Sequence, residues 1–202
     1  MIFEPLTSAI ILLLSSSTVY AASVSSTPAQ TFHGIGGSGA WWPNALYNFP
    51  EATRQNLSAL LFSDSGLGLS SYRYNVGAGG VNVSNPTRAP QTFYVSPGVY
   101  DWTRDAAGVY FLRAAGEHGV EHLTVFANSA PAPLTSGKAS CNGAFVSGTG
   151  AAYGAFLADV IAHFRQSSWG ANVDLVSPMN EPDSSFGPSP CGQEGMQVVP
   201  SL

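Results

Sequence analysis

The sequence predicts an α/β fold in which helices cover a parallel β-sheet. Segments with strand patterns alternate with segments of helical periodicity, and the connections between the strands are long enough to hold a helix. The predicted strands are rich in apolar residues, as strands of buried parallel sheets are. Two architectures fit this order: a doubly wound sheet, or the first half of a (β/α)8 barrel.

The first two predicted strands flank a predicted helix. Residues 31–35 are a short strand candidate, and residues 50–62 carry leucines at helical spacing on one face. Residues 69–76 alternate and are rich in aromatic side chains, which indicates a strand. A Gly-, Pro- and Asn-rich loop follows over residues 77–102, and loops of that length in compact domains are usually functional.

The pattern then repeats. Residues 104–118 are predicted as a helix that ends at Gly119, a residue suited to the position after a helix end. Residues 122–127 form an apolar strand. Residues 151–165 have the strongest helical periodicity in the chain, and residues 173–179 form the last predicted strand.

Polar residues follow that last strand directly. Its apolar residues deliver Asn180, Glu181 and Pro182 to one point, and parallel α/β proteins place catalytic groups at the ends of such strands. The alternative is that Glu181 merely opens a solvated loop.

The N-terminal residues have the pattern of a secretory signal peptide. The apolar run AIILLL at residues 9–14 leads into small residues, with cleavage expected after Ala21, and it is too short to span a membrane. Glu4 and the absence of Lys and Arg before the run depart from the pattern, so a buried N-terminal strand or helix is the alternative. We expect residues 1–21 to be the signal peptide of a secreted, extracellular protein, residues 22–30 to be mobile, and residues 31–202 to form one domain.

Composition excludes several classes of protein. With 45% hydrophobic and 9% charged residues, the chain is not a disordered tail. Its seven Lys and Arg residues form no basic cluster, which excludes a nucleic-acid partner. The histidines have no metal-ligand spacing, so we expect neither a metal nor a cofactor; they are His33, His118, His122 and His163.

Two further features suit secretion. Asn56 and Asn82 begin N-glycosylation sequons. Cys141 and Cys191 permit one disulfide bond in an oxidising compartment, and the alternative is two unpaired buried thiols. In the predicted architecture both cysteines lie in loops on the same face, which favours the bond.

A nucleotide-binding sheet is a weaker alternative. Gly34, Gly36 and Gly39 match a G-x-G-x-x-G pattern. The helix that should follow at once is expected only near Pro50, and no acidic residue ends the next strand to hold a ribose.

Several motifs together resemble glycoside hydrolase family 30 of clan A. They are FHGIGGSGAW, SSYRYNVGAGG, SPMNEPDSSFG and CGQEG, and they extend from about Gln30 to Leu202. The sequence is most similar to the fungal secreted branch of endo-β-1,6-galactanases. The resemblance implies a (β/α)8 TIM barrel that hydrolyses β-glycosidic bonds of a polysaccharide or glycoconjugate with retention of configuration, and a monomer when full length.

The resemblance also implies roles for individual residues. Glu181 matches the general acid/base, Asn180 the residue that binds the sugar 2-hydroxyl, and Arg73 the arginine beneath the two carboxylates. A close cation lowers a carboxyl pKa, so Arg73 is better suited to keeping the nucleophile ionised than to assisting the acid. Its alternative role is a structural ion pair. Trp41 and Trp42 are candidates for stacking on sugar faces, although most aromatic side chains are core residues.

Two departures from the family pattern limit the interpretation. The segment Asn128–Leu134 lacks the aromatic residues usual in this branch, which affects substrate preference. We expect about four of the eight barrel units here, because a complete barrel takes roughly 250 residues, and Glu194 follows Glu181 too closely to be the family nucleophile. The alternatives are a glucosylceramidase or xylanase of the same family, or a non-catalytic carbohydrate-binding fragment.

Overall fold

The computed structural model describes residues 22–166 and 168–198. The chain divides into two units, residues 1–32 and 33–202. The described part of the first unit, residues 22–32, is exposed and contains no helix or strand. The expected signal peptide lies outside the described residues.

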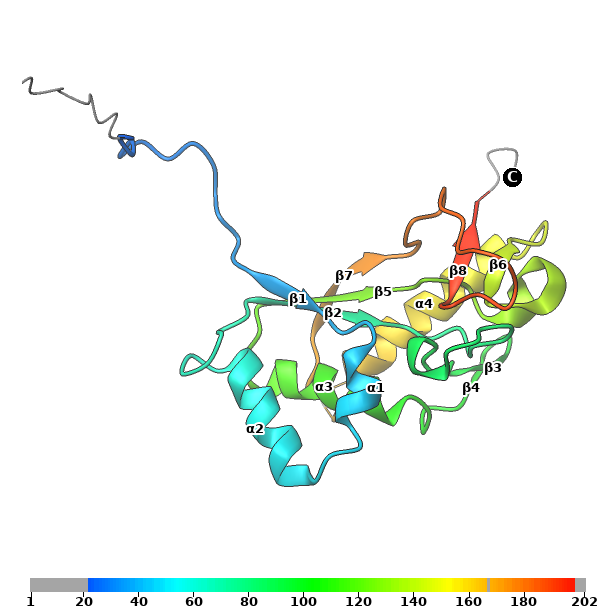
Figure 1. Ribbon diagram of the computed structural model, residues 1–202, viewed down its shortest axis with the longest axis horizontal. Coiled ribbons are helices and arrows are strands. Elements are labelled where there is room, and N and C mark those ends of the chain that lie inside the picture. The colour runs from blue at the N-terminus through cyan, green and yellow to red at the C-terminus, as the bar shows by residue number, and fades with distance from the viewer. Residues whose placement is uncertain (1–21, 167, 199–202) are drawn as a thin grey trace, which may run out of the picture. The chain divides into compact units, whose positions relative to one another are not determined.

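The second unit alternates strands and helices as the sequence predicts (Figure 1). Four of its strands and four helices form the main sheet and its cover, and short strands and 3-10 turns lie in the loops. The elements are β1 Gly36–Ser38, α1 Trp42–Leu46, α2 Glu51–Phe62, β2 Ser71–Asn75, β3 Tyr94–Ser96, β4 Val99–Tyr100, α3 Ala106–Glu117, β5 His122–Phe126, β6 Cys141–Ala144, α4 Gly150–Phe164, β7 Val173–Ser177 and β8 Gly195–Gln197.

The main sheet is parallel throughout, with strand order β1-β2-β5-β7. Each strand therefore pairs with the next main strand along the chain, and the order never reverses. A doubly wound sheet reverses its order at a switch point, whereas a (β/α)8 barrel adds its strands one after another. The observed order within the described residues is that of the barrel.

Helices α1 to α4 lie on the same side of this sheet in Figure 1. Strand side chains alternate between the two faces, so Tyr72, Tyr74, Leu123 and Val125 point toward the helices and are buried. The Tyr74 ring meets the Phe164 ring of α4 edge-on, with centroids 5.4 Å apart. Burial of such aromatic side chains is the main stabilising contribution in this layer.

The other face of the sheet is more open and more polar. Arg73 and Thr124 point to this side, and the Arg73 guanidinium lies over the Phe126 ring, 3.6 Å from its centroid. Leu175 on β7 is 51% exposed. The face without helices therefore carries the side chains that are available for a site.

The structure differs from the sequence prediction at the first strand. Residues 31–35 form no strand, and β1 is the segment Gly36–Ser38 instead. Its register places Gly36 beside Ser71, where a side chain on the glycine would clash with Ser71. The residues of β1 are small so that its backbone can lie close to β2, and they therefore show no alternation of apolar side chains. The predicted strand at residues 31–35 was wrong for this reason.

A second difference is the short helix α1, which the sequence analysis did not predict. It begins at Trp42 and has Pro43 in its first turn, a position where proline fits because its missing N–H needs no partner.

The predicted loop of residues 77–102 contains the β3–β4 hairpin. Over the described residues, none of the helices is both long and apolar enough to cross a membrane.

Candidate active site

A cavity of about 300 Å³ lies at the carboxyl ends of the four parallel strands. Strands β1, β2 and β5 supply part of its lining, and the turn after β7 supplies Asn180 and Glu181, as expected where parallel strands end at one edge of a sheet. Gln193 closes it from the loop before β8. The lining residues are Ser38, Ala40, Trp41, Arg73, Phe126, Asn128, Asn180, Glu181 and Gln193.

Glu181 is presented to this cavity by the turn after β7. The backbone N–H of Asn180 donates to the carbonyl of Ala127 at 3.0 Å, which ties the turn to the end of β5. Glu181 itself has φ 48°, in the left-handed region that side chains other than glycine seldom adopt. Such strained positions cluster at functional sites. The carboxyl group is exposed and able to reach a ligand.

Arg73 binds Asn180 and lies near Glu181 at this strand end. Its Nη2 donates to Asn180 Oδ1 at 3.0 Å, and its guanidinium rests on the Phe126 ring. Burial lowers the pKa of Arg73, while the negative charge of Glu181 nearby opposes that shift. The three residues that the sequence analysis singled out, Arg73, Asn180 and Glu181, are therefore brought together.

The side chains of the adjacent residues Trp41 and Trp42 point to different parts of the structure. Trp41 lines the cavity, and the Arg88 guanidinium lies 4.8 Å from the centre of its ring. Trp42 packs into the helix layer, 4.7 Å from Phe111 between ring centroids, and its Nε1 donates to the carbonyl of Ser38 at 2.8 Å. The expectation of a cleft position is corrected for Trp42, because helix α1 turns its side chain toward the core.

A second cavity of about 390 Å³ lies next to the first. Glu181 and Gln193 line both, so the carboxyl group of Glu181 has open space on two sides. A polymer that crosses Glu181 would have room for units on either side. The other lining residues are Arg88, Ser184, Ser185, Phe186 and Gly192.

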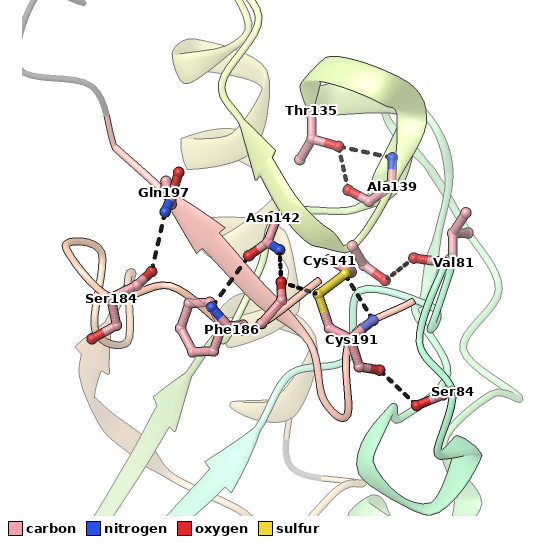
Figure 2. Close-up of a disulfide and its surroundings, with 12 residues drawn as sticks. Val81, Ser84, Thr135, Ala139, Cys141, Asn142, Ser184, Phe186, Cys191 and Gln197 are labelled. Carbon is pink, nitrogen blue, oxygen red and sulfur yellow. Dashed lines mark hydrogen bonds between the residues drawn. A yellow bond between two sulfur atoms is a disulfide. The ribbon is translucent and has the colours of Figure 1, made fainter. Parts of the chain in front are cut away.

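The loops around these cavities are tied together, and we call this region the loop clamp: residues 78–84, 139–142 and 186–197. A disulfide bond joins Cys141 to Cys191. Figure 2 shows Ser84 on one side of it, donating to the carbonyl of Cys191 at 3.0 Å, and Asn142 on the other, accepting from the Phe186 amide at 3.3 Å. The strands β6 and β8 pair within the clamp.

Glu194 is the buried centre of the loop clamp. Its carboxylate accepts the backbone N–H of Gly80 at 2.8 Å and that of Ala78 at 3.1 Å. Burial raises the pKa of Glu194 to about 8, although these backbone hydrogen bonds act in the opposite direction. Glu194 is fully buried and lines neither cavity.

The part of the chain that the structure describes contains no cluster of metal-binding side chains. Within residues 22–166 and 168–198, no group of three or more His, Cys, Asp or Glu side chains has the geometry to hold an ion. The Gly34, Gly36 and Gly39 pattern surrounds β1, where a Cβ on Gly39 would lie 2.1 Å from the Tyr72 hydroxyl, so close packing accounts for Gly39. Asn56 and Asn82 are both exposed.

Sequence reasoning missed several residues of the site. Phe126 supports Arg73, Asn128 is buried in the cavity wall, and Gln193 stands beside Glu181. Asn128 directly follows the strand at residues 122–127, so its position after a strand end was a usable signal. Gln193 had no such signal, because its loop is placed by distant contacts.

Comparison with known proteins agrees with this geometry. The family model for O-glycosyl hydrolase family 30 matches residues 20–201. A conserved exported protein from Bacteroides fragilis is 27% identical with a TM-score of 0.75, covering 84% of this chain and 38% of that protein. No curated protein matches the chain.

Two solved enzymes share the fold. The catalytic domain of GH30 xylanase C from Talaromyces cellulolyticus is 23% identical with a TM-score of 0.55, covering 82% of this chain and 39% of that one. An endo-β-1,6-glucanase is 16% identical with a TM-score of 0.61, covering 83% of this chain and 37% of that one. The chain thus spans less than two fifths of the solved structures it matches. With a family model that covers nearly all of it and the strand order of a (β/α)8 barrel, the chain belongs to O-glycosyl hydrolase family 30.

Proposed function

We propose that this chain supplies the acid/base part of a retaining β-glycosidase active site that acts on a polysaccharide. The observation that carries the proposal is the position of Glu181: exposed at a strand end, between two cavities, with Arg73 and Asn180 beside it. Family membership supports the same class of reaction.

In this proposal Glu181 first acts as an acid. It donates its proton to the glycosidic oxygen as the bond from that oxygen to the anomeric carbon breaks. A second carboxylate attacks the anomeric carbon and forms a glycosyl-enzyme intermediate. Glu181, now ionised, then takes a proton from the water that hydrolyses this intermediate.

The second carboxylate must come from elsewhere in the protein. A retaining glycosidase needs two carboxyl groups about 5–5.5 Å apart. In the described part of the chain, no acidic residue other than Glu181 lines either cavity. We propose that polypeptide outside these four strands brings the nucleophile to the open face of the sheet, near Arg73.

We propose a β-1,6-linked galactan as the substrate, on the strength of the sequence motifs. The similarity in fold to an endo-β-1,6-glucanase fits a β-1,6 linkage. The similarity to a xylanase of the family supports a xylan equally well, so xylanase is the second candidate. The segment Asn128–Leu134 contains no aromatic ring, so among the described residues Trp41 is the aromatic side chain we propose for stacking on the sugar.

We also propose that the protein is secreted and acts outside the cell. The apolar run near the N-terminus, the disulfide bond between Cys141 and Cys191 and the exposed sequons at Asn56 and Asn82 support this. Intact mass before and after treatment with a glycan-removing enzyme tests it. Protein from its native source that carries no glycan and has two free thiols would contradict the proposal.

The replacement Glu181→Gln tests the proposed chemistry. In the complete protein it should retain the fold but lose about 10²-fold or more of the turnover of a polysaccharide, because the leaving sugar needs protonation. In an aryl glycoside with an acidic phenol, the phenolate can leave without that proton. The rate of the glycosylation step on this substrate should therefore fall far less. Pre-steady-state release of the phenol measures this step.

Asp183→Asn is the matched control. Asp183 is an exposed carboxylate in the same turn as Glu181, but it lines neither cavity, so this variant should have the turnover of the unmodified protein. Equal losses on both substrates for Glu181→Gln would refute the acid/base role. Turnover of β-1,6-galactan against xylan, compared on one preparation, decides between the two substrate candidates.

A further inference from the structure

Gln193 occupies a position that the proposed chemistry leaves unexplained. It lines both cavities beside Glu181 and is only partly buried. Its side-chain amide makes no hydrogen bond to any other residue that the structure describes, whereas the nearby Gln197 amide donates to the carbonyl of Ser184 at 3.4 Å. The Gln193 amide is therefore a donor and an acceptor that face open space next to the proposed acid.

The next residue, Glu194, fixes the backbone on which Gln193 stands. Its side chain is fully buried, and its carboxylate is held by the backbone N–H groups of Ala78 and Gly80. Gly195 donates from its backbone to Ser140 at 3.0 Å, and Cys191 is held by the disulfide bond. Gln193 thus lies in a short segment that is anchored on both sides.

The loop of residues 77–80 has a backbone conformation that lets it bind the Glu194 side chain. Gly79 and Gly80 have φ values of 95° and 71°, which allow the N–H groups of Ala78 and Gly80 to turn toward one carboxyl group while the Gly79 N–H donates to the carbonyl of Pro90. A Cβ on Gly80 would lie 2.8 Å from the Ala89 side chain, so the close packing also requires glycine there. The Gly-Ala-Gly-Gly loop after β2 therefore surrounds the Glu194 carboxyl group with backbone N–H donors.

We propose that Gln193 binds hydroxyl groups of the substrate sugar next to the bond that Glu181 protonates, and that Glu194 is its positioning residue. The proposal rests on the proposed function of Glu181. A carboxamide fits neighbouring sugar hydroxyls because it donates and accepts at once. A rigid anchor makes this contact effective, since a loosely held polar group loses entropy on binding.

The first test replaces Gln193 in the complete protein. Gln193→Ala should lower kcat/KM on the polysaccharide by about tenfold, the value of one well-formed hydrogen bond, without a change in melting temperature. Gln193→Glu should move the alkaline limb of the pH–rate profile to higher pH, because a nearby negative charge favours the protonated acid. Gln166→Ala is the matched control, since Gln166 is exposed and lines neither cavity.

The second test asks whether Glu194 acts through Gln193. Glu194→Gln keeps a carbonyl oxygen that can accept from Gly80, so it should fold, whereas Glu194→Ala removes the anchor. Glu194→Ala should lower kcat/KM about as much as Gln193→Ala, and the double variant should be little worse than either single one. Glu194→Gln should recover much of the loss.

The outcomes separate this inference from the proposed function. Full activity of both Gln193 variants would overturn the contact, and losses that multiply in the double variant would overturn the positioning role of Glu194. If Glu181→Gln abolishes polysaccharide turnover while both Gln193 variants keep full activity, only this inference fails. If Glu181→Gln is fully active, the proposed function fails.

Discussion

The helix layer and the loop clamp are held together by different interactions. In the helix layer, aromatic and aliphatic side chains pack across α3, α4 and the sheet, with Phe111 and Phe164 completely buried. In the loop clamp, a disulfide bond, backbone hydrogen bonds and the buried Glu194 carboxylate do this work. The first region contains regular helices, and the second consists of loops and very short strands.

The difference teaches how a chain rich in Gly, Ser and Pro fixes a site on loops. Small and polar residues bury too little apolar surface to hold a loop in one conformation. In the loop clamp, the disulfide bond and hydrogen bonds supply the stabilisation that apolar packing would otherwise give. They lie around Gln193, beside Glu181. Packing therefore supports the scaffold, and discrete links support the site.

The largest effect is expected from a cavity in the helix layer. Phe111→Ala removes a fully buried ring that packs against Trp42, with centroids 4.7 Å apart, and should lower the free energy of unfolding by about 3–5 kcal/mol. Urea unfolding measures the loss. The exposed Leu60→Ala on α2 is the control and should cost about 1 kcal/mol or less. Equal losses would contradict the description of the packed layer.

The next effect is a pH dependence that involves both regions. Burial raises the pKa of Asp105, at the start of α3, to about 7, although hydrogen bonds from Tyr74 and from the Gly108 N–H oppose the shift. A raised folded-state pKa stabilises the fold fully below the unfolded value near 4 and loses this contribution as pH rises through 7. For Asp105 the loss is on the order of 4 kcal/mol.

The unfolding free energy should therefore fall as the pH rises from about 4 to 8, with Glu194 extending the fall beyond pH 7 because its pKa is raised to about 8. Urea titrations at several pH values measure this slope. Asp105→Asn should flatten the lower part of the slope, and Glu194→Gln the upper part. A stability that rises over this range would refute the assignment of both groups as buried acids.

The smallest of the three effects is expected in the loop clamp. Replacing Cys141 and Cys191 together by serine should lower the free energy of unfolding by about 2–4 kcal/mol, since the bond closes a loop of 50 residues. It should also reduce polysaccharide turnover, because Gln193 loses one of its anchors. Differential scanning calorimetry with parallel activity assays measures both. Unchanged turnover would show that the hydrogen bonds of the clamp suffice to place the site.

Sequence patterns predicted the helix layer well, and in the loop clamp they predicted the disulfide bond between Cys141 and Cys191 but not the backbone contacts around Glu194. The helices expected at residues 104–118 and 151–165 are α3 and α4, because their apolar residues recur with the period of a helix. The strand before Glu181 was predicted for a similar reason. Local periodicity carries this information for the helices, since α3 and α4 bury one face against their neighbours, whereas in β7 only Val173 is buried.

Other features depend on contacts that no local pattern contains. Glu194 meets Ala78 across a sequence separation of 116 residues, so its burial could not be inferred from its neighbours. Trp41 and Trp42 are adjacent in sequence, and only the start of α1 decides which of them faces the cavity. The strand β1 consists of two glycines and a serine, which give no hydrophobic signal.

The backbone of Glu181 has a consequence for directed evolution. A left-handed conformation costs a residue with a side chain about 1–2 kcal/mol, and glycine and asparagine adopt it most readily. A screen that selects only for heat resistance will therefore favour replacement of Glu181 by these residues, and every such variant loses the carboxyl group. Libraries of this protein should be ranked by turnover first, because at this codon improved stability and lost function are selected together.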